Sequence, residues 1–170
     1  MKLSIRQVES LDIGHLRKMM KEFVNELGLS YPVMDNAELD RAMMEVLVNI
    51  KNPDCVYLIA FDGKKPVGFA KGVIYNKAYG KPSRIGLAQE LYVVPGKRGK
   101  IVGYKLVKEC FKLGLARGVE AFESVGVYGS TDKRWERYGF QPYLVYGHMD
   151  MDRVKKILGG RSEDYKSNSD

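Results

Sequence analysis

A two-residue turn signal in the middle of the chain separates two runs of strand-forming residues. Residues 55–61 (CVYLIAF) are rich in β-branched and aromatic side chains, and Asp62-Gly63 is a typical hairpin dipeptide. Residues 67–75 can return as the partner strand. A third run, residues 85–94, follows a polar loop and stops at Pro95-Gly96. The sequence therefore predicts three strands in the middle of the chain.

Helical patterns flank these strands. After an alternating, strand-like segment at residues 3–8, apolar residues recur at helical spacing over residues 10–28. A second helical pattern covers residues 35–50, with Asp35 as its N-cap, and a third covers residues 100–117. Each of the three has one apolar face, which predicts helices that pack on the sheet.

The last third of the chain predicts shorter elements. We expect a strand at residues 120–127, a short helix at residues 131–138 and one or two closing strands at residues 140–151. No repeat or linker divides the chain, so residues 1–158 are expected to form a single domain, followed by a flexible tail at residues 159–170. The fold class is mixed α/β (α+β), with about six to seven strands and about four helices in the order β-α-α-β-β-β-α-β-α-β-β.

Composition excludes several classes of protein. The chain of 170 residues is 45% hydrophobic and 29% charged, as in soluble globular proteins. Its two cysteines, Cys55 and Cys110, provide neither a disulfide framework nor a zinc-ligand set, and we expect a cytoplasmic location. The longest apolar run, residues 55–61, is too short to span a bilayer, and the first residues lack a signal peptide. The net charge of +7 leaves an anionic partner open: nucleic acid, a membrane surface or a phosphorylated cofactor.

The positive charge is concentrated where the third helix is expected to begin. A helix N-terminus carries partial positive charge and favours acidic residues, so cations there repel the dipole unless an anion is bound. Glycines at the same place let backbone N–H groups approach such an anion closely. The turn holds three cations and three glycines, namely Lys97, Arg98, Lys100, Gly96, Gly99 and Gly103. This pattern predicts a phosphate site, although the spacing fits neither a Walker loop nor a dinucleotide-binding fingerprint.

Two segments carry a family resemblance. The strand Leu91-Tyr92-Val93-Val94-Pro95 is followed by the turn Arg98-Gly99-Lys100-Ile101-Val102-Gly103. Together they resemble the L-x-V-x-P and Q/R-x-x-G-x-G/A pattern of the GNAT superfamily of acetyl-CoA-dependent N-acetyltransferases. Further on, Trp135-Glu136-Arg137-Tyr138-Gly139-Phe140 resembles the family segment Y-E-K-x-G-F. The order of elements over residues 3–151 is also similar, so the resemblance implies a GNAT-like central sheet.

The resemblance implies how acetyl-CoA would bind as a co-substrate, without a metal. In this family the cofactor lies where two neighbouring strands splay apart. The backbone of Leu91, Tyr92 and Val93 would pair with the pantetheine arm and direct an N–H at the thioester oxygen. The pyrophosphate would be held by the turn and the start of the helix, at Arg98, Gly99, Lys100, Ile101, Val102 and Gly103.

The resemblance also points to candidate catalytic residues. A carboxylate must take a proton from the attacking amine, directly or through water. Glu90 is the first candidate, because many family members carry a Glu before the cofactor strand, and Glu123 on the adjacent expected strand is the second. The family often uses the Tyr of Y-E-K-x-G-F as the general acid. Trp135 occupies that position here and an indole cannot supply the proton. Tyr138, one helical turn later, and Tyr128 are the candidate acids, neither of which inherits the role by position, and the coenzyme thiolate can also leave through water.

Three functions remain open at this point. The first is an N-acetyltransferase that transfers an acetyl group from acetyl-CoA to a primary amine by direct attack in a ternary complex. The second is a GNAT-fold protein that binds acyl-CoA without turnover, since Ile101 and Trp135 replace family residues. The third is a basic nucleic-acid-binding module, but no aromatic platform or helix-turn-helix pattern accompanies the basic cluster. We therefore expect neither a nucleic-acid nor a membrane partner, and residues 140–151 could pair across a homodimer.

Overall fold

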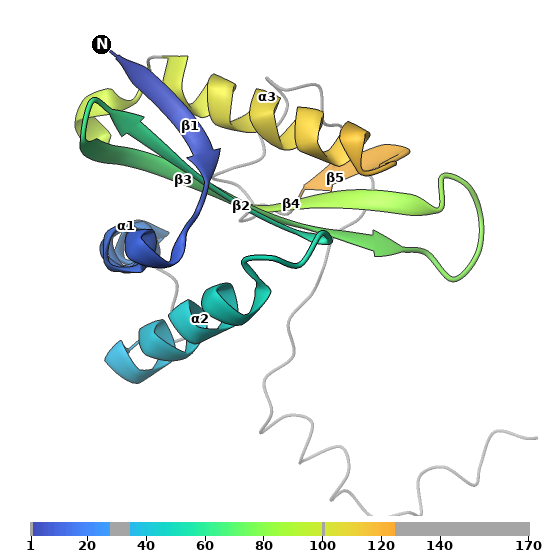
Figure 1. Ribbon diagram of the computed structural model, residues 1–170, viewed down its shortest axis with the longest axis horizontal. Helices are drawn as coiled ribbons and strands as arrows, with labels where there is room; N and C mark the ends of the chain where they lie inside the picture. The colour runs from blue at the N-terminus through green and yellow to red at the C-terminus, as the bar shows by residue number, and fades with distance from the viewer. Residues whose placement is uncertain (1, 28–34, 100, 125–170) are drawn as a thin grey trace, which may run out of the picture. The chain divides into compact units, whose positions relative to one another are not determined.

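The computed structural model describes residues 2–27, 35–99 and 101–124, in which five strands form one mixed sheet (Figure 1). The strands follow the order of the sequence across the sheet. Each pairs with the next in antiparallel fashion, except that β4 and β5 are parallel. Their bounds are β1, Leu3–Gln7; β2, Cys55–Asp62; β3, Lys65–Asn76; β4, Arg84–Val93; and β5, Ala121–Ser124.

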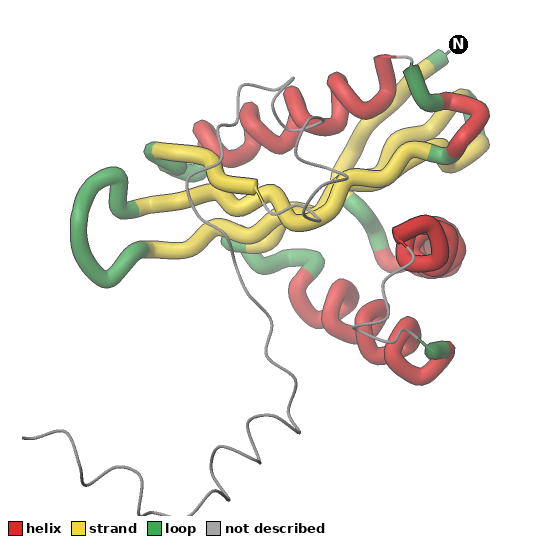
Figure 2. The backbone as a smooth tube through the Cα atoms, turned by 180° about the vertical axis from the view of Figure 1, so that it is seen from behind, coloured by secondary structure: helices red, strands yellow, loops and turns green. Residues whose placement is uncertain are grey.

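Helices cover both faces of this sheet. The main ones are α1, Ile13–Leu27; α2, Asn36–Asn49; and α3, Ile101–Ala116, with short 3-10 turns η1 at Ser10–Asp12 and η2 at Pro95–Lys97. Helices α1 and α2 lie on one face, and α3 lies on the other, where it connects the parallel strands β4 and β5 (Figures 1 and 2). A parallel pair requires such a crossover connection, because a tight turn reverses the chain direction and can join only antiparallel strands.

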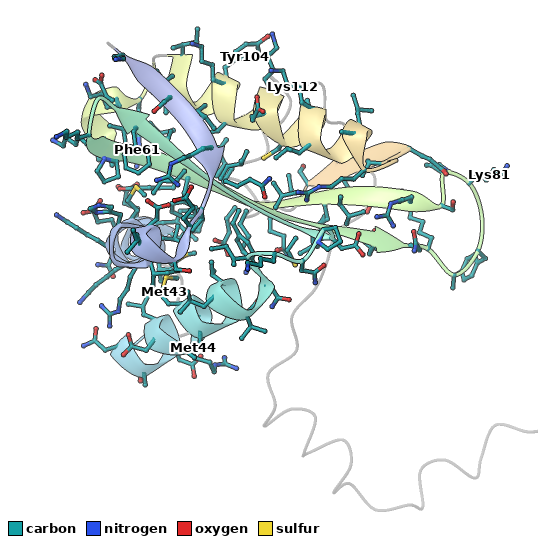
Figure 3. All side chains as sticks on the ribbon, viewed as in Figure 1. Met43, Met44, Phe61, Lys81, Tyr104 and Lys112 are labelled. Atoms are coloured by element: carbon teal, nitrogen blue, oxygen red, sulfur yellow. The ribbon has the colours of Figure 1, made fainter. Side chains whose placement is uncertain are left out.

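The apolar faces of the helices account for two core layers. On the α1/α2 face the buried residues are Val8, Leu16, Met19, Met20, Leu39, Met43, Val46, Tyr57, Ile59, Phe69 and Tyr92. On the α3 face they are Val56, Leu58, Ala60, Val67, Ala70, Val102 and Leu106. Residues of β2 alternate between the two layers, as a strand covered on both sides must. On α2, Met43 is buried while its neighbour Met44 is 59% exposed (Figure 3).

The fold class predicted from the sequence is confirmed, with small differences at element ends. The hairpin turns at Gly63, which has a φ of 61°, and β3 begins at Lys65, two residues before the predicted start of the strand. Asp35 caps α2 as expected, since its side chain accepts a 2.9 Å hydrogen bond from the backbone N–H of Glu38. The elements predicted after Ser124, and therefore the single-domain boundary and the tail, lie outside the described residues.

Candidate active site

Strand β4 carries a β-bulge at Gln89, the residue before the predicted base. Ala88 lies opposite Gly72 on β3 and Glu90 lies opposite Lys71, so Gln89 is the extra residue. A bulge bends its strand and re-aims the neighbouring side chains. Oε1 of Gln89 and Oε2 of Glu90 are buried and have no hydrogen-bond partner among the described residues. Buried polar atoms are normally paired, so two unpaired ones at an irregular strand position indicate a functional site.

Glu90 lies in a charged cluster on the α1/α2 face of the sheet. Nζ of Lys71 is 3.9 Å from Oε1 of Glu90 and 3.6 Å from Oε1 of Glu45 on α2. Burial raises the pKa of Glu90 above its ordinary value; the positive charge of Lys71 opposes this shift and the negative charge of Glu45 adds to it. Burial also raises the pKa of Tyr57, which lies opposite Lys71, so the phenol stays protonated. A carboxylate with a raised pKa is better suited to accept a proton at neutral pH.

Glu123 has a different environment. It lies opposite Leu87, on the other side of the bulge from Glu90. Nζ of Lys77 is 2.9 Å from its Oε1, and the hydroxyl of Tyr75 donates a 2.7 Å hydrogen bond to its Oε2. The structure thus places the second candidate base in an ion pair near the end of the sheet, apart from the first.

Four residues singled out by sequence lie outside the described residues. They are Lys100 in the turn, Trp135 in the Y-E-K-x-G-F-like segment, and the two candidate acids Tyr128 and Tyr138. Their proposed contacts with coenzyme and thiolate stay predictions.

The turn before α3 has the backbone geometry of an anion site. Gly99 has a φ of 69°, a left-handed conformation that glycine adopts without strain, and no atom lies within 4 Å of the position of a Cβ there. Helix α3 begins at Ile101, which is 45% exposed, while Val102 is buried in the core. The N–H groups of the first helical turn, up to Gly103, have no intrahelical acceptors, and the helix dipole favours an anion beside them.

The basic side chains of the turn are not free, contrary to expectation. Nζ of Lys97 is 2.7 Å from Oδ2 of Asp62, and the guanidinium of Arg98 pairs with the carboxylate of Glu26 on α1. The same guanidinium lies 5.5 Å from the centroid of the Tyr92 ring. The premise that these cations need an external anion is therefore wrong for Lys97 and Arg98, because distant segments supply carboxylates. The case for an anion site rests on the backbone.

The residues predicted to bind the pantetheine arm, Leu91 to Val93, lie on β4 where one edge of the strand has no described neighbour. Tyr92 is buried toward α1, its ring at 6.0 Å and 63° from that of Phe23, while Leu91 and Val93 pack toward α3. On one side this stretch pairs with β3. On the other side, the described pairing with β5 ends at Ala88. Among the described residues this backbone edge is therefore unpaired from Leu91 to Val93, and its pairing with a pantetheine arm stays a prediction.

Lys71, Glu45 and Glu26 surround the candidate site residues, although no sequence motif pointed to them. A lysine inside the apolar run of residues 67–75 was a usable signal, because lysine is rarely buried unless it is paired. The two glutamates lie on amphipathic helices, where acidic residues are ordinary, so only the tertiary structure identifies them. In the part of the chain that the structure describes, no cluster of His, Cys, Asp or Glu could hold a metal ion, and no helix could cross a membrane.

Comparison with known proteins identifies the family. The sequence model of the acetyltransferase (GNAT) family matches residues 20–140. Among solved structures, the chain resembles glucosamine-6-phosphate N-acetyltransferase from Arabidopsis thaliana at 19% identity and a TM-score of 0.66, covering 89% of this chain and 100% of that one. It resembles a predicted acetyltransferase from Clostridium acetobutylicum, solved with acetyl-CoA, at 17% identity and a TM-score of 0.74, covering 89% and 97%.

A third structure with the same fold is an aminoglycoside N-acetyltransferase in complex with CoA, at 16% identity and a TM-score of 0.71, covering 87% of this chain and 94% of that one. No match was found among curated proteins. At these identities the solved structures show the fold, and the family match, which spans well over half of the chain, shows the membership. The protein belongs to the acetyltransferase (GNAT) family and is an acyltransferase.

Proposed function

We propose that this protein transfers the acetyl group of acetyl-CoA to a primary amine by direct attack in a ternary complex, with Glu90 as the general base. The observation that carries the proposal is the buried Oε2 of Glu90 at the bulge of β4, which has no hydrogen-bond partner within residues 2–27, 35–99 and 101–124 and lies next to the strand edge at Leu91 to Val93. Solved structures with the same fold contain acetyl-CoA or CoA, which supports the choice of co-substrate.

Two backbone features support the proposed binding of the coenzyme. The open backbone at Gly99 and the N-terminal turn of α3 suit a pyrophosphate, since N–H groups and the helix dipole both favour an anion there. The edge of β4 from Leu91 to Val93 suits the amide groups of pantetheine. When bound, acetyl-CoA supplies the thioester carbonyl on which the amine acts.

Glu90 removes the proton that the amine must lose as its nitrogen bonds to the carbonyl carbon. Its raised pKa makes it a stronger base than a solvated glutamate, and the positive charge of Lys71 keeps enough of it ionised to act. The backbone N–H groups of β4 stabilise the negative charge on the carbonyl oxygen. The carbon–sulfur bond breaks, and the coenzyme thiolate takes a proton from water or from Tyr138.

Coenzyme binding is tested by titrating acetyl-CoA, CoA and a short DNA duplex separately against thermal unfolding. A coenzyme present at a hundred times its dissociation constant stabilises the fold by about 2.7 kcal/mol. We expect stabilisation by both coenzymes. Stabilisation by the duplex alone would contradict the proposal and favour nucleic-acid binding.

The role of Glu90 is tested by thiol release with a panel of amines, comparing Glu90→Gln with Glu123→Gln. We expect Glu90→Gln to lower kcat by about a hundredfold or more and to leave coenzyme stabilisation intact. Glu123→Gln should lower the melting temperature, because it weakens the contacts with Lys77 and Tyr75, with a much smaller effect on kcat. A large loss of kcat in Glu123→Gln, with little loss in Glu90→Gln, would assign the base to Glu123. Coenzyme binding without thiol release for any amine would indicate a non-catalytic protein.

A further inference from the structure

The side chain of Lys71 places a primary amine beside the candidate base. An acceptor amine that gives its proton to Glu90 must bring its nitrogen to about 3 Å from the carboxylate. Nζ of Lys71 lies 3.9 Å from Oε1 of Glu90. A movement of about 1 Å would therefore bring it to the distance at which the proton can pass. The chain thus carries, within itself, an amine of the class that the proposed function requires as acceptor.

The register of the sheet holds this amine near the proposed thioester position. Lys71 on β3 lies opposite Glu90 on β4, where the bulge at Gln89 interrupts the pairing. Leu91, the next residue on β4, begins the strand edge on which the thioester is placed. Lys71, Glu90 and Leu91 also line one cavity, so the amine, the base and the thioester strand border the same space. A reacting group held in this way avoids much of the entropic cost of an encounter from solution.

The charged surroundings attract the amine without fixing it. Three ionisable side chains face it from three elements, namely Glu90 on β4, Glu45 on α2 and Tyr57 on β2. The two carboxylates lie 3.9 Å and 3.6 Å from Nζ, which is longer than a hydrogen bond. The side chain of Glu45 is also 57% exposed, so solvent weakens its attraction. Lys71 can therefore move toward the thioester without breaking a short hydrogen bond to either carboxylate.

We propose that Lys71 is a site of self-acetylation, at which the protein transfers the acetyl group of acetyl-CoA to its own ε-amino group when no external amine is bound. The inference rests on the proposed function, because it uses the same thioester and the same base. The ammonium group gives one proton to Glu90, which passes it to water. The neutral nitrogen then bonds to the carbonyl carbon and the carbon–sulfur bond breaks. The second nitrogen proton reaches the coenzyme thiolate through water.

Acetylation of Lys71 has a consequence for the base. The amide carries no charge, so Glu90 loses the positive charge that opposes the rise in its pKa, while Glu45 continues to raise it. A larger share of Glu90 is then protonated at neutral pH and unable to accept a proton. The acetyl group also occupies space beside the base that an external amine needs. We therefore expect the modified protein to be less active toward external amines.

The first test incubates the full chain with acetyl-CoA in the absence of any amine and follows its peptides by mass spectrometry. We expect acetylation of Lys71 at least tenfold faster than acetylation of Lys112. Lys112 is the internal reference, because its side chain is 61% exposed on α3 and reports the direct chemical reaction of acetyl-CoA with a solvated lysine (Figure 3). Acetylation of Lys71 no faster than that of Lys112 would overturn the proposal.

The second test asks whether the modification uses the base. Glu90→Gln should slow acetylation of Lys71 by at least tenfold and leave the rate at Lys112 unchanged. Thermal stabilisation by acetyl-CoA shows that the variant folds and binds the coenzyme. Equal rates at Lys71 in the wild type and in Glu90→Gln would show a purely chemical reaction and would contradict self-acetylation.

The third test measures the effect on activity. The protein is incubated with acetyl-CoA, the coenzyme is removed, and thiol release is then measured with an external amine. Wild type should lose activity at least threefold relative to a sample incubated without acetyl-CoA. Lys71→Arg keeps the positive charge but cannot form the amide, so its two samples should have equal activity. A loss of the same size in Lys71→Arg would exclude Lys71 as the cause.

The outcomes separate this inference from the proposed function. If acetyl-CoA neither stabilises the protein nor supports thiol release with any amine, the proposed function fails. If external amines are acetylated while Lys71 stays unmodified, only the self-acetylation proposal fails.

Discussion

Replacing Gly114 by alanine tests how tightly α3 packs on the sheet. Alanine favours a helix interior over glycine by about 1 kcal/mol, so a helix free of contacts would gain stability. Here the added Cβ would lie 2.7 Å and 2.8 Å from two carbons of the Phe122 ring, distances so short that something must shift. The ring has little room to move away from the added Cβ, because the Phe111 ring lies 4.6 Å from it at an interplanar angle of 50° and Gly86 lies close to it as well.

The two contributions have opposite signs, and the steric one is larger. Overpacking a core costs about 1–3 kcal/mol, and the confinement of the Phe122 ring favours the upper half of that range. After the gain in helix propensity, we expect Gly114→Ala to lower the free energy of unfolding by about 1–2 kcal/mol. For a domain of this size that corresponds to a decrease in melting temperature of roughly 2–8 °C, measured by circular dichroism.

Gly14→Ala is the matched control. Gly14 lies in the first turn of α1, and no atom lies within 4 Å of the position of its Cβ. The same substitution should raise the free energy of unfolding there by about 0.5–1 kcal/mol. In a Phe122→Leu background the cost of Gly114→Ala should largely disappear, since the clash is with the ring. If Gly114→Ala is stabilising, as at Gly14, the packing described around Phe122 is incorrect.

Three further predictions concern charged groups. Lys71→Met should raise the pKa of Glu90 further, because it removes the positive charge that lowers it, and should shift the acidic limb of the pH profile of kcat/KM to higher pH. Lys71→Arg keeps the charge and should leave the limb in place. An acidic limb that does not move in Lys71→Met would show that Lys71 does not act on the base. Glu26→Gln should remove the charge that pairs with Arg98, which stays bonded to the carbonyl of Val93, and lower the Kd of acetyl-CoA by roughly three- to tenfold at low salt. Glu22→Gln is the control, because Glu22 accepts a hydrogen bond from Tyr92 and forms no ion pair with Arg98 among the described residues; equal effects of the two variants in calorimetry would refute this. Arg6→Met should lower the free energy of unfolding by about 2 kcal/mol at neutral pH, because Asp12 is buried and accepts 2.6 Å and 2.8 Å hydrogen bonds from Arg6. Burial opposes ionisation of Asp12, but the hydrogen bonds from Arg6 and from the backbone of Glu9 lower its pKa overall. The difference in free energy of unfolding between Arg6→Met and wild type, measured by urea titration, should therefore shrink as the pH falls below about 4. A difference that stays constant with pH would contradict this role of Arg6.

Local patterns predicted the elements of this fold well. The Asp62-Gly63 signal marked the β2–β3 hairpin, and the apolar stripes that include Leu16 and Met43 are the buried faces of α1 and α2. These features depend on residues close together in the sequence, so the sequence displays them directly. The glycine turn belongs to the same class, since the left-handed φ of Gly99 is a local property.

The charge balance of the site could not be predicted in the same way. Arg98 pairs with Glu26, which is 72 residues away, and Glu90 meets Lys71 through strand register. The crowding of cations in the sequence does not reveal the carboxylates that distant segments supply, so it overestimates the need for an external anion. The bulge at Gln89 likewise has no local signal, because it depends on how β4 pairs with β3.

The order of the strands has a kinetic consequence. Strands β2, β3 and β4 pair with their immediate neighbours in sequence, whereas β1 must find β2 across α1 and α2. Short loops close at a lower entropic cost than long ones, so we expect the β2–β4 meander to be formed in the folding transition state and β1 to join it afterwards. In stopped-flow experiments, Ile59→Val in the meander should mainly slow refolding, and Ile5→Val in β1 should mainly accelerate unfolding. The amino-terminal strand would then govern how long the native enzyme lasts, and the meander how quickly it is made.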